Sequence, residues 1–116
     1  MKKAVLSVFL FFVVLTASAT VKKAVDSTKI YSIKLASADL KKGAVKFLIR
    51  GGIVSTRVKG QEVFEKKYNI HYYDFGCVMP SNISIEDYNK IVANYMDRKY
   101  GKGWRKEVRK DIQGIR

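Results

Sequence analysis

Cys77 and His71 are the only cysteine and the only histidine in the chain, and they bracket its most strand-like stretch. A thiol nucleophile needs a base within hydrogen-bond reach, and His71 is the only imidazole. The two positions are six residues apart, so an extended strand rising about 3.3 Å per residue would separate them by roughly 20 Å. A Cys–His dyad would therefore require a sharp fold-back at Gly76.

Other roles remain open for Cys77. Nearby cations can lower the pKa of a thiol and make it reactive, whereas a cysteine at the end of a strand can also be a small buried hydrophobe. In an oxidising compartment, a lone cysteine can pair with another chain or carry a small-thiol cap. We therefore keep Cys77 as a redox or reactive candidate and name no catalytic residue.

Other catalytic and cofactor patterns are weak. Asp74, at the end of the same strand-like stretch, is a candidate catalytic acid or base only in the sense that any carboxylate is. No spacing of paired His, Cys or carboxylate ligands occurs, so we predict no metal site and no cofactor. Gly51-Gly52 lacks the Lys-Ser/Thr that follows in a phosphate-binding loop.

Positive charge is the clearest chemical signal. The 116-residue chain has 23 Lys and Arg against 10 Asp and Glu, a formal net charge of +13. Such an excess suits contact with phosphates, anionic lipid head groups or acidic sugars. It can also merely keep a small protein soluble. The positive residues gather near the C-terminus, where thirteen positions hold seven of them: Arg98, Lys99, Lys102, Arg105, Lys106, Arg109 and Lys110.

Aromatic side chains are interleaved with these cations. Tyr95, Tyr100 and Trp104 would stack on a base or a sugar ring if they were exposed. Alternatively they belong to the core, and the aliphatic stems of the cations cover it. We predict that this basic face binds an anionic polymer, a membrane surface or an envelope protein; no specific nucleic-acid motif is present.

Alternating apolar and polar residues predict a small sheet of two or three strands, at residues 30–35, 44–50 and 70–75. A helix is the rival interpretation of residues 44–50. Residues 37–43 are predicted to form a helical turn, with Ser37 or Asp39 as N-cap and Gly43 as its end.

Helical patterns dominate the remainder. Residues 60–68 are predicted as a short helix with Val63 and Phe64 inward. Residues 84–100 form an apolar stripe of helical period behind an N-cap at Ser84. Residues 103–112 are predicted as a second C-terminal helix. The predicted fold is a single α+β domain in which the sheet packs against the two C-terminal helices. Its predicted core is Ile33, Leu35, Val45, Phe47, Ile49, Phe64, Ile70, Tyr72, Val92, Tyr95, Trp104 and Val108.

The N-terminus resembles a secretory signal peptide. Met1-Lys2-Lys3 is a positive n-region, residues 4–15 are apolar, and Ala17-Ser18-Ala19 fits a cleavage site. The apolar run is shorter than the about 20 residues that span a bilayer, although an uncleaved anchor is the alternative. We predict residues 1–19 as signal peptide with cleavage after Ala19, residues 20–29 as a flexible lead-in, and residues 30–116 as the domain of a secreted or periplasmic protein.

The chain carries five motifs in order: Phe64-Glu65-Lys66-Lys67-Tyr68, Tyr73-Asp74-Phe75-Gly76-Cys77, Tyr88-Asn89, Lys99-Tyr100-Gly101 and Trp104-Arg105-Lys106-Glu107. This set resembles the motifs of the FEKKY domain-containing proteins, a family of small bacterial proteins that often carry a signal peptide. The resemblance implies an exported bacterial domain and carries over no functional residue.

Together these patterns predict an exported, non-catalytic module that binds an anionic or envelope partner. One alternative is a structural or interaction protein linked through an intermolecular disulfide at Cys77, as in a covalent dimer. The other is an enzyme that uses Cys77 or Asp74.

Overall fold

The predicted α+β class is confirmed by the computed structural model, which describes residues 23–52 and 57–116, with side chains from Ser27 onward. The predicted signal peptide and its cleavage site lie outside these residues. Within the described part, no helix combines the length and the apolar character needed to cross a membrane. The elements in chain order are α1 (Lys23–Lys41), β1 (Lys46–Ile49), α2 (Gln61–Tyr68), β2 (His71–Asp74), α3 (Ile85–Tyr100) and the 3₁₀ turn η1 (Lys102–Lys106).

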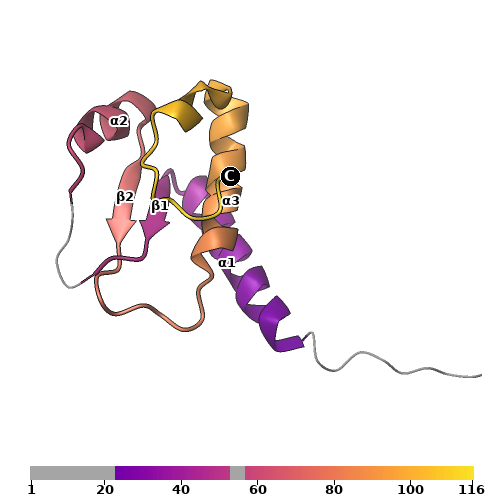
Figure 1. Cartoon of the computed structure of the whole chain (residues 1–116). Helices are drawn as coiled ribbons and strands as arrows, with labels where there is room; N and C mark the ends of the chain where they lie inside the picture. The colour runs from indigo at the N-terminus through magenta and orange to yellow at the C-terminus, as the bar shows by residue number, and fades with distance from the viewer. Residues whose placement is uncertain (1–22, 53–56) are drawn as a thin grey trace, which may run out of the picture.

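The two strands are parallel, in a register that pairs Lys46 with His71 and Ile49 with Asp74. The chain returns from the end of β1 to the start of β2 through α2, which lies near the amino ends of the strands (Figure 1). The strands predicted within 44–50 and 70–75 are therefore confirmed. Leu48 was not among the predicted core residues, yet it is buried like Phe47 and Ile49 on either side of it, because β1 is covered on both faces.

Side chains cap both outer edges of this small sheet. On the β1 edge, the amide of Asn89 accepts a hydrogen bond from the Leu48 N–H at 2.8 Å and donates one to the Leu48 carbonyl at 2.9 Å. On the β2 edge, the Glu65 carboxylate accepts from the Tyr72 N–H at 3.1 Å. Both side chains supply hydrogen bonds that a neighbouring strand would otherwise make.

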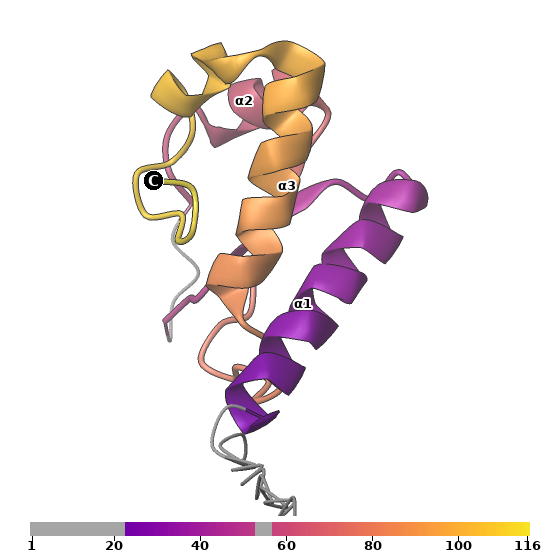
Figure 2. The same cartoon turned by 90° about the vertical axis from the view of Figure 1, so that its right-hand side faces the viewer.

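The strand predicted at residues 30–35 is wrong, and so is the lead-in from Lys23 on, because both belong to α1. Helical spacing places the small residues Ser32 and Ala36 on one face, where both are fully buried. Their size allows α1 and α3 to lie close together (Figure 2). The Ser32 hydroxyl also accepts a hydrogen bond from the Ser84 N–H at 2.7 Å, at the start of α3.

The end of α1 was predicted correctly, but its start was not. Gly43, with φ +75°, lies two residues after Lys41, the last helical residue, as expected for the end of a helix. Ser37 and Asp39 are interior helical residues rather than N-caps.

The helices predicted over 60–68 and 84–100 are confirmed as α2 and α3. In α2, Phe64 is buried as predicted, whereas Val63 is 70% exposed and was wrongly placed inward. At the start of α3, the Ser84 hydroxyl oxygen accepts from the Asp87 N–H at 3.4 Å, which confirms the predicted N-cap.

The helix predicted over 103–112 is wrong: only η1 is helical, and it is followed by an irregular C-terminal segment (residues 107–116). One contact within that segment is incompatible with a helix. Arg109 binds the Asp111 carboxylate two residues away, at 2.7 and 2.9 Å, and residues with this spacing do not face each other on a helix.

The core forms where α3, the sheet, α2 and the C-terminal segment meet. The residues buried as predicted are Val45, Phe47, Ile49, Phe64, Ile70, Val92, Trp104 and Val108. The predicted core residues that are only half-buried are Ile33, Leu35, Tyr72 and Tyr95.

Candidate anion-binding groove

The C-terminal segment is held across the sheet by contacts near both of its ends. At its start, Glu107 accepts hydrogen bonds from the Tyr68 hydroxyl and from Lys67, the latter at 2.7 Å. Near its end, Gly114 adopts φ +85° against the first turn of α3, where a Cβ atom would lie 2.3 Å from the Glu86 carbonyl oxygen. Only glycine fits there without displacing backbone. In Figure 1 the segment returns from the top of α3 toward the beginning of that helix.

Arg109 anchors the middle of the segment, and its side chain is buried, with only 9% of the residue exposed. Its guanidinium donates to Asp111 through two nitrogens and to Gln61 Oε1 at 3.0 Å. It also lies 5.5 Å from the centre of the Tyr72 ring. A bidentate hydrogen bond to a carboxylate fixes the orientation of a guanidinium, so Arg109 holds the segment in place.

A groove of about 450 Å³ runs between this segment and the turn that precedes α2. We call it the anion groove. One wall is formed by residues 58–61 and the other by residues 106–111, with Phe64 and Tyr72 at its base. Burial raises the pKa of Tyr72 to about 12, although its hydrogen bond with Arg109 acts in the opposite direction. Its hydroxyl is therefore uncharged at neutral pH.

The free charges on the rim of the anion groove are positive. Lys59, Lys106 and Lys110 are exposed, and their ammonium groups form no ion pair with any described residue. The two acidic residues of the groove are already paired, Glu107 with Lys67 and Asp111 with Arg109. Their negative charges offset those partners and leave the three lysines uncompensated.

The seven predicted cations thus divide into two groups. Arg105 and Arg109 hold the fold: Arg105 binds both oxygens of Asp97 at 3.0 and 2.9 Å and donates to the Ile115 carbonyl. The other five are exposed, namely Arg98, Lys99, Lys102, Lys106 and Lys110. Among these, Lys99 lies over the rings of Tyr95 and Tyr100. Lys106 and Lys110 line the anion groove.

Lys59 completes the rim, and no sequence signal indicated it. It lies in the loop before α2, far from the C-terminal cations in sequence.

Trp104 is fully buried, so it belongs to the core and offers no surface on which a base or a sugar ring could stack.

The candidate reactive residues are placed less favourably for chemistry. His71 begins β2 and Cys77 follows its end, so the strand separates them. Asp74 has a structural role, because its Oδ1 accepts from the Gly76 N–H at 2.7 Å and its carboxylate lies against Gly51. Cys77 is a free, exposed thiol beside a hollow that Arg50 also lines. No three His, Cys, Asp or Glu of the described residues lie close enough to hold a metal ion.

Acid should weaken the attachment of the C-terminal segment. Hydrogen bonds from Arg105, Lys67 and Arg109 lower the pKa values of Asp97, Glu107 and Asp111, respectively. A depressed native pKa stabilises the fold above the unfolded-state value, which is about 3.9 for Asp and 4.3 for Glu. This stabilisation is lost as the pH falls through the native value. We expect little change in unfolding free energy from these groups between pH 7 and about 5, and a decline below about pH 4.

Asp97→Asn tests this expectation by urea unfolding at pH 7, 4 and 3. The variant should be less stable than the wild type at pH 7 and should lose less stability on acidification, since one of the titrating groups is gone. A decline below pH 4 as steep as that of the wild type would show that Asp97 does not contribute.

Comparisons with known proteins add no assignment. No family model, no curated protein and no solved structure matches the chain, so its resemblance to the FEKKY domain-containing proteins stays a prediction.

Proposed function

We propose that this chain is a non-catalytic binding module for an anionic partner, with the rim of the anion groove as its contact surface. The observation that carries the proposal is that Lys59, Lys106 and Lys110 line one groove, are exposed and form no ion pair with a described residue. Mutual repulsion among neighbouring cations disfavours the free state, and a bound anion relieves it. We also propose export, from the signal-like residues 1–19.

Two features of the surroundings support a binding role for this surface. The paired acids Glu107 and Asp111 need not move for an anion to approach the lysines, because their own partners already hold them. The walls are fixed by the buried Arg109 and by the Glu107 contacts with α2, so the rim is organised before any ligand arrives.

Heparin, a sulfated polymer, is a suitable probe, with binding measured by fluorescence anisotropy over a range of NaCl concentrations. Lys106→Gln/Lys110→Gln should weaken binding and reduce the steepness of log K against log salt by about 2. Each cation that is removed means that about one fewer counterion is released from the polymer on binding. Neutral dextran should not bind at any salt concentration.

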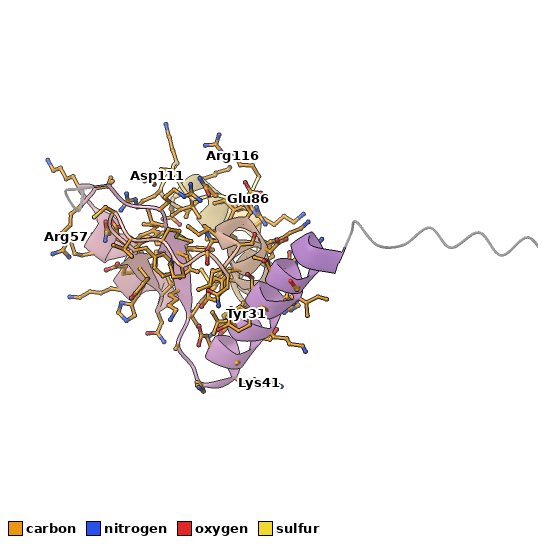
Figure 3. The ribbon with its side chains drawn as sticks, turned by 90° about the horizontal axis from the view of Figure 1, so that it is seen from below. Tyr31, Lys41, Arg57, Glu86, Asp111 and Arg116 are labelled. Atoms are coloured by element: carbon orange, nitrogen blue, oxygen red, sulfur yellow. The ribbon has the colours of Figure 1, made fainter. Side chains whose placement is uncertain are left out.

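A matched control separates a local site from net charge. Lys41→Gln/Lys42→Gln removes the same two charges from exposed positions at the end of α1. Figure 3 shows Lys41 on the side of the molecule opposite to Asp111. This control should change heparin affinity much less than the groove variant. Equal weakening by the two variants, or binding insensitive to salt, would contradict the proposal.

The second candidate function is attachment through an intermolecular disulfide at Cys77, which its free and exposed thiol favours. In this case, the protein exported to an oxidising compartment should run as a covalent dimer or a mixed disulfide without reductant, and Cys77→Ser should abolish that species. A monomer with a titratable thiol would rule out this function.

A further inference from the structure

The anion groove combines two kinds of surface that a simple polyanion would not use together. Its lining includes the exposed cations Lys59, Lys106 and Lys110 and also the apolar side chains of Val58, Phe64 and Val108. Its volume of about 450 Å³ falls within the roughly 300–1,000 Å³ of small-molecule sites. A flat cationic patch would suffice for a charged polymer.

We infer that the anion groove binds a small amphipathic organic anion, a molecule with one apolar body and one acidic group. The inference rests on the proposed function and specifies its ligand. The apolar body lies against Val58, Phe64 and Val108, and its carboxylate, sulfonate or phosphate group lies among the lysines of the rim. The ligand is a single dissolved molecule, since a groove of this size encloses one small body rather than a membrane surface.

Charge and polarity together exclude simpler ligands. An inorganic anion would satisfy the lysines but would leave the apolar walls in contact with water. A neutral apolar molecule would cover the walls but would place uncompensated ammonium groups beside a region of lowered polarity. Only a molecule that carries both features complements both surfaces.

The contributions of the two walls come from distant parts of the chain. Val58 and Lys59 precede α2, whereas Lys106 and Val108 belong to the end of η1 and the start of the C-terminal segment. The Gln61–Arg109 hydrogen bond joins the two walls directly, at 3.0 Å. The ligand therefore enters a preformed site, which lowers the entropic cost of binding.

The test uses three probes that separate these features. 1-Anilinonaphthalene-8-sulfonate has both an aromatic body and an acidic group, N-phenyl-1-naphthylamine has the same body without the charge, and inorganic sulfate has the charge alone. We expect saturable 1:1 binding of the sulfonate, at least tenfold weaker binding of the neutral analogue, and no displacement of the sulfonate by sulfate at equal ionic strength.

Two variants assign the binding to the groove. Val58→Ser changes a wall residue that is 46% exposed, so the fold should tolerate it. It should weaken both aromatic probes severalfold and leave heparin binding unchanged. Lys59→Gln/Lys106→Gln should weaken binding of the sulfonate at least fivefold and should not weaken binding of the neutral analogue, which no longer places these two ammonium groups beside its apolar body. Unaltered far-UV circular dichroism and unfolding midpoints would show that both variants are folded.

The failures of the two proposals are distinguishable. If Val58→Ser leaves sulfonate binding unchanged, or if the neutral analogue binds as tightly as the sulfonate, the amphipathic ligand is wrong while heparin binding through the lysines stands. If vesicles of anionic lipid bind and the dissolved sulfonate does not, the inference of a small-molecule ligand is wrong as well. Loss of the heparin difference between the groove and α1 lysine variants would contradict the proposed function itself.

Discussion

Replacing Asn89 with leucine should lower the free energy of unfolding by about 3–5 kcal/mol. Asn89 is fully buried, and its amide makes hydrogen bonds to the N–H and C=O of Leu48 and to the Gln113 carbonyl, the last at 3.0 Å. Leucine has the same branched arrangement of heavy atoms but no polar atom, so all three backbone groups would lose their partner. Each unsatisfied buried group costs about 1–3 kcal/mol.

An effect of this size is a large fraction of the total stability of a small domain, which is typically about 5–15 kcal/mol. Urea unfolding followed by circular dichroism measures it directly. Amide hydrogen exchange adds a local test, because the Leu48 N–H should lose its protection in the variant even under native conditions.

Asn94→Leu is the matched control, since Asn94 is an exposed residue of the same helix. It should change the free energy of unfolding by no more than about 0.5 kcal/mol. An Asn89→Leu protein as stable as the Asn94→Leu protein would show that Asn89 is not needed to satisfy the edge of β1.

The parts of the fold that the sequence predicted correctly depend on local signals. Ser84 and Asp87 lie within one helical turn, and their hydrogen bond forms whatever surrounds it. Asn69, at φ +49°, ends α2 because its side chain tolerates left-handed geometry. Elements bounded by such residues can be located without tertiary information.

The errors arose where tertiary contacts decide between two local patterns. Residues 30–35 alternate like a strand, yet as part of a helix they place Ser32 on one face with the following Ala36, against α3. The hydrogen bond between Ser32 and Ser84 joins positions that are 52 residues apart. No window of local sequence contains that contact, so periodicity alone favoured the wrong element.

The anion groove was predictable only in part, for the same reason. The concentration of cations near the C-terminus indicated a basic surface. It did not indicate that Arg105 would form an ion pair with Asp97 and Arg109 one with Asp111. Residues 103–112 were predicted as a helix, and on a helix Arg109 and Asp111, two residues apart, would not face each other. The contribution of Lys59 follows only from the packing of the C-terminal segment near the turn that precedes α2.

Replacing Trp104 with alanine should lower the free energy of unfolding by about 3–5 kcal/mol. The indole ring is fully buried, 5.6 Å from the centre of the Phe47 ring and 4.8 Å from the Arg105 guanidinium carbon. Alanine would leave a cavity where α3, β1 and the C-terminal segment meet. The indole N–H would also be lost as a donor to Asp97, at 3.0 Å.

Trp104→Phe separates packing from hydrogen bonding in the same urea unfolding experiment. Phenylalanine keeps most of the ring contact with Phe47 but loses the bond to Asp97, so the cost should be about 1–2 kcal/mol. Asp97 retains Arg105 as a partner in this variant. If the phenylalanine variant were as unstable as the alanine variant, the Asp97 hydrogen bond rather than the buried ring would be the main contribution of Trp104 to holding the C-terminal segment on α3.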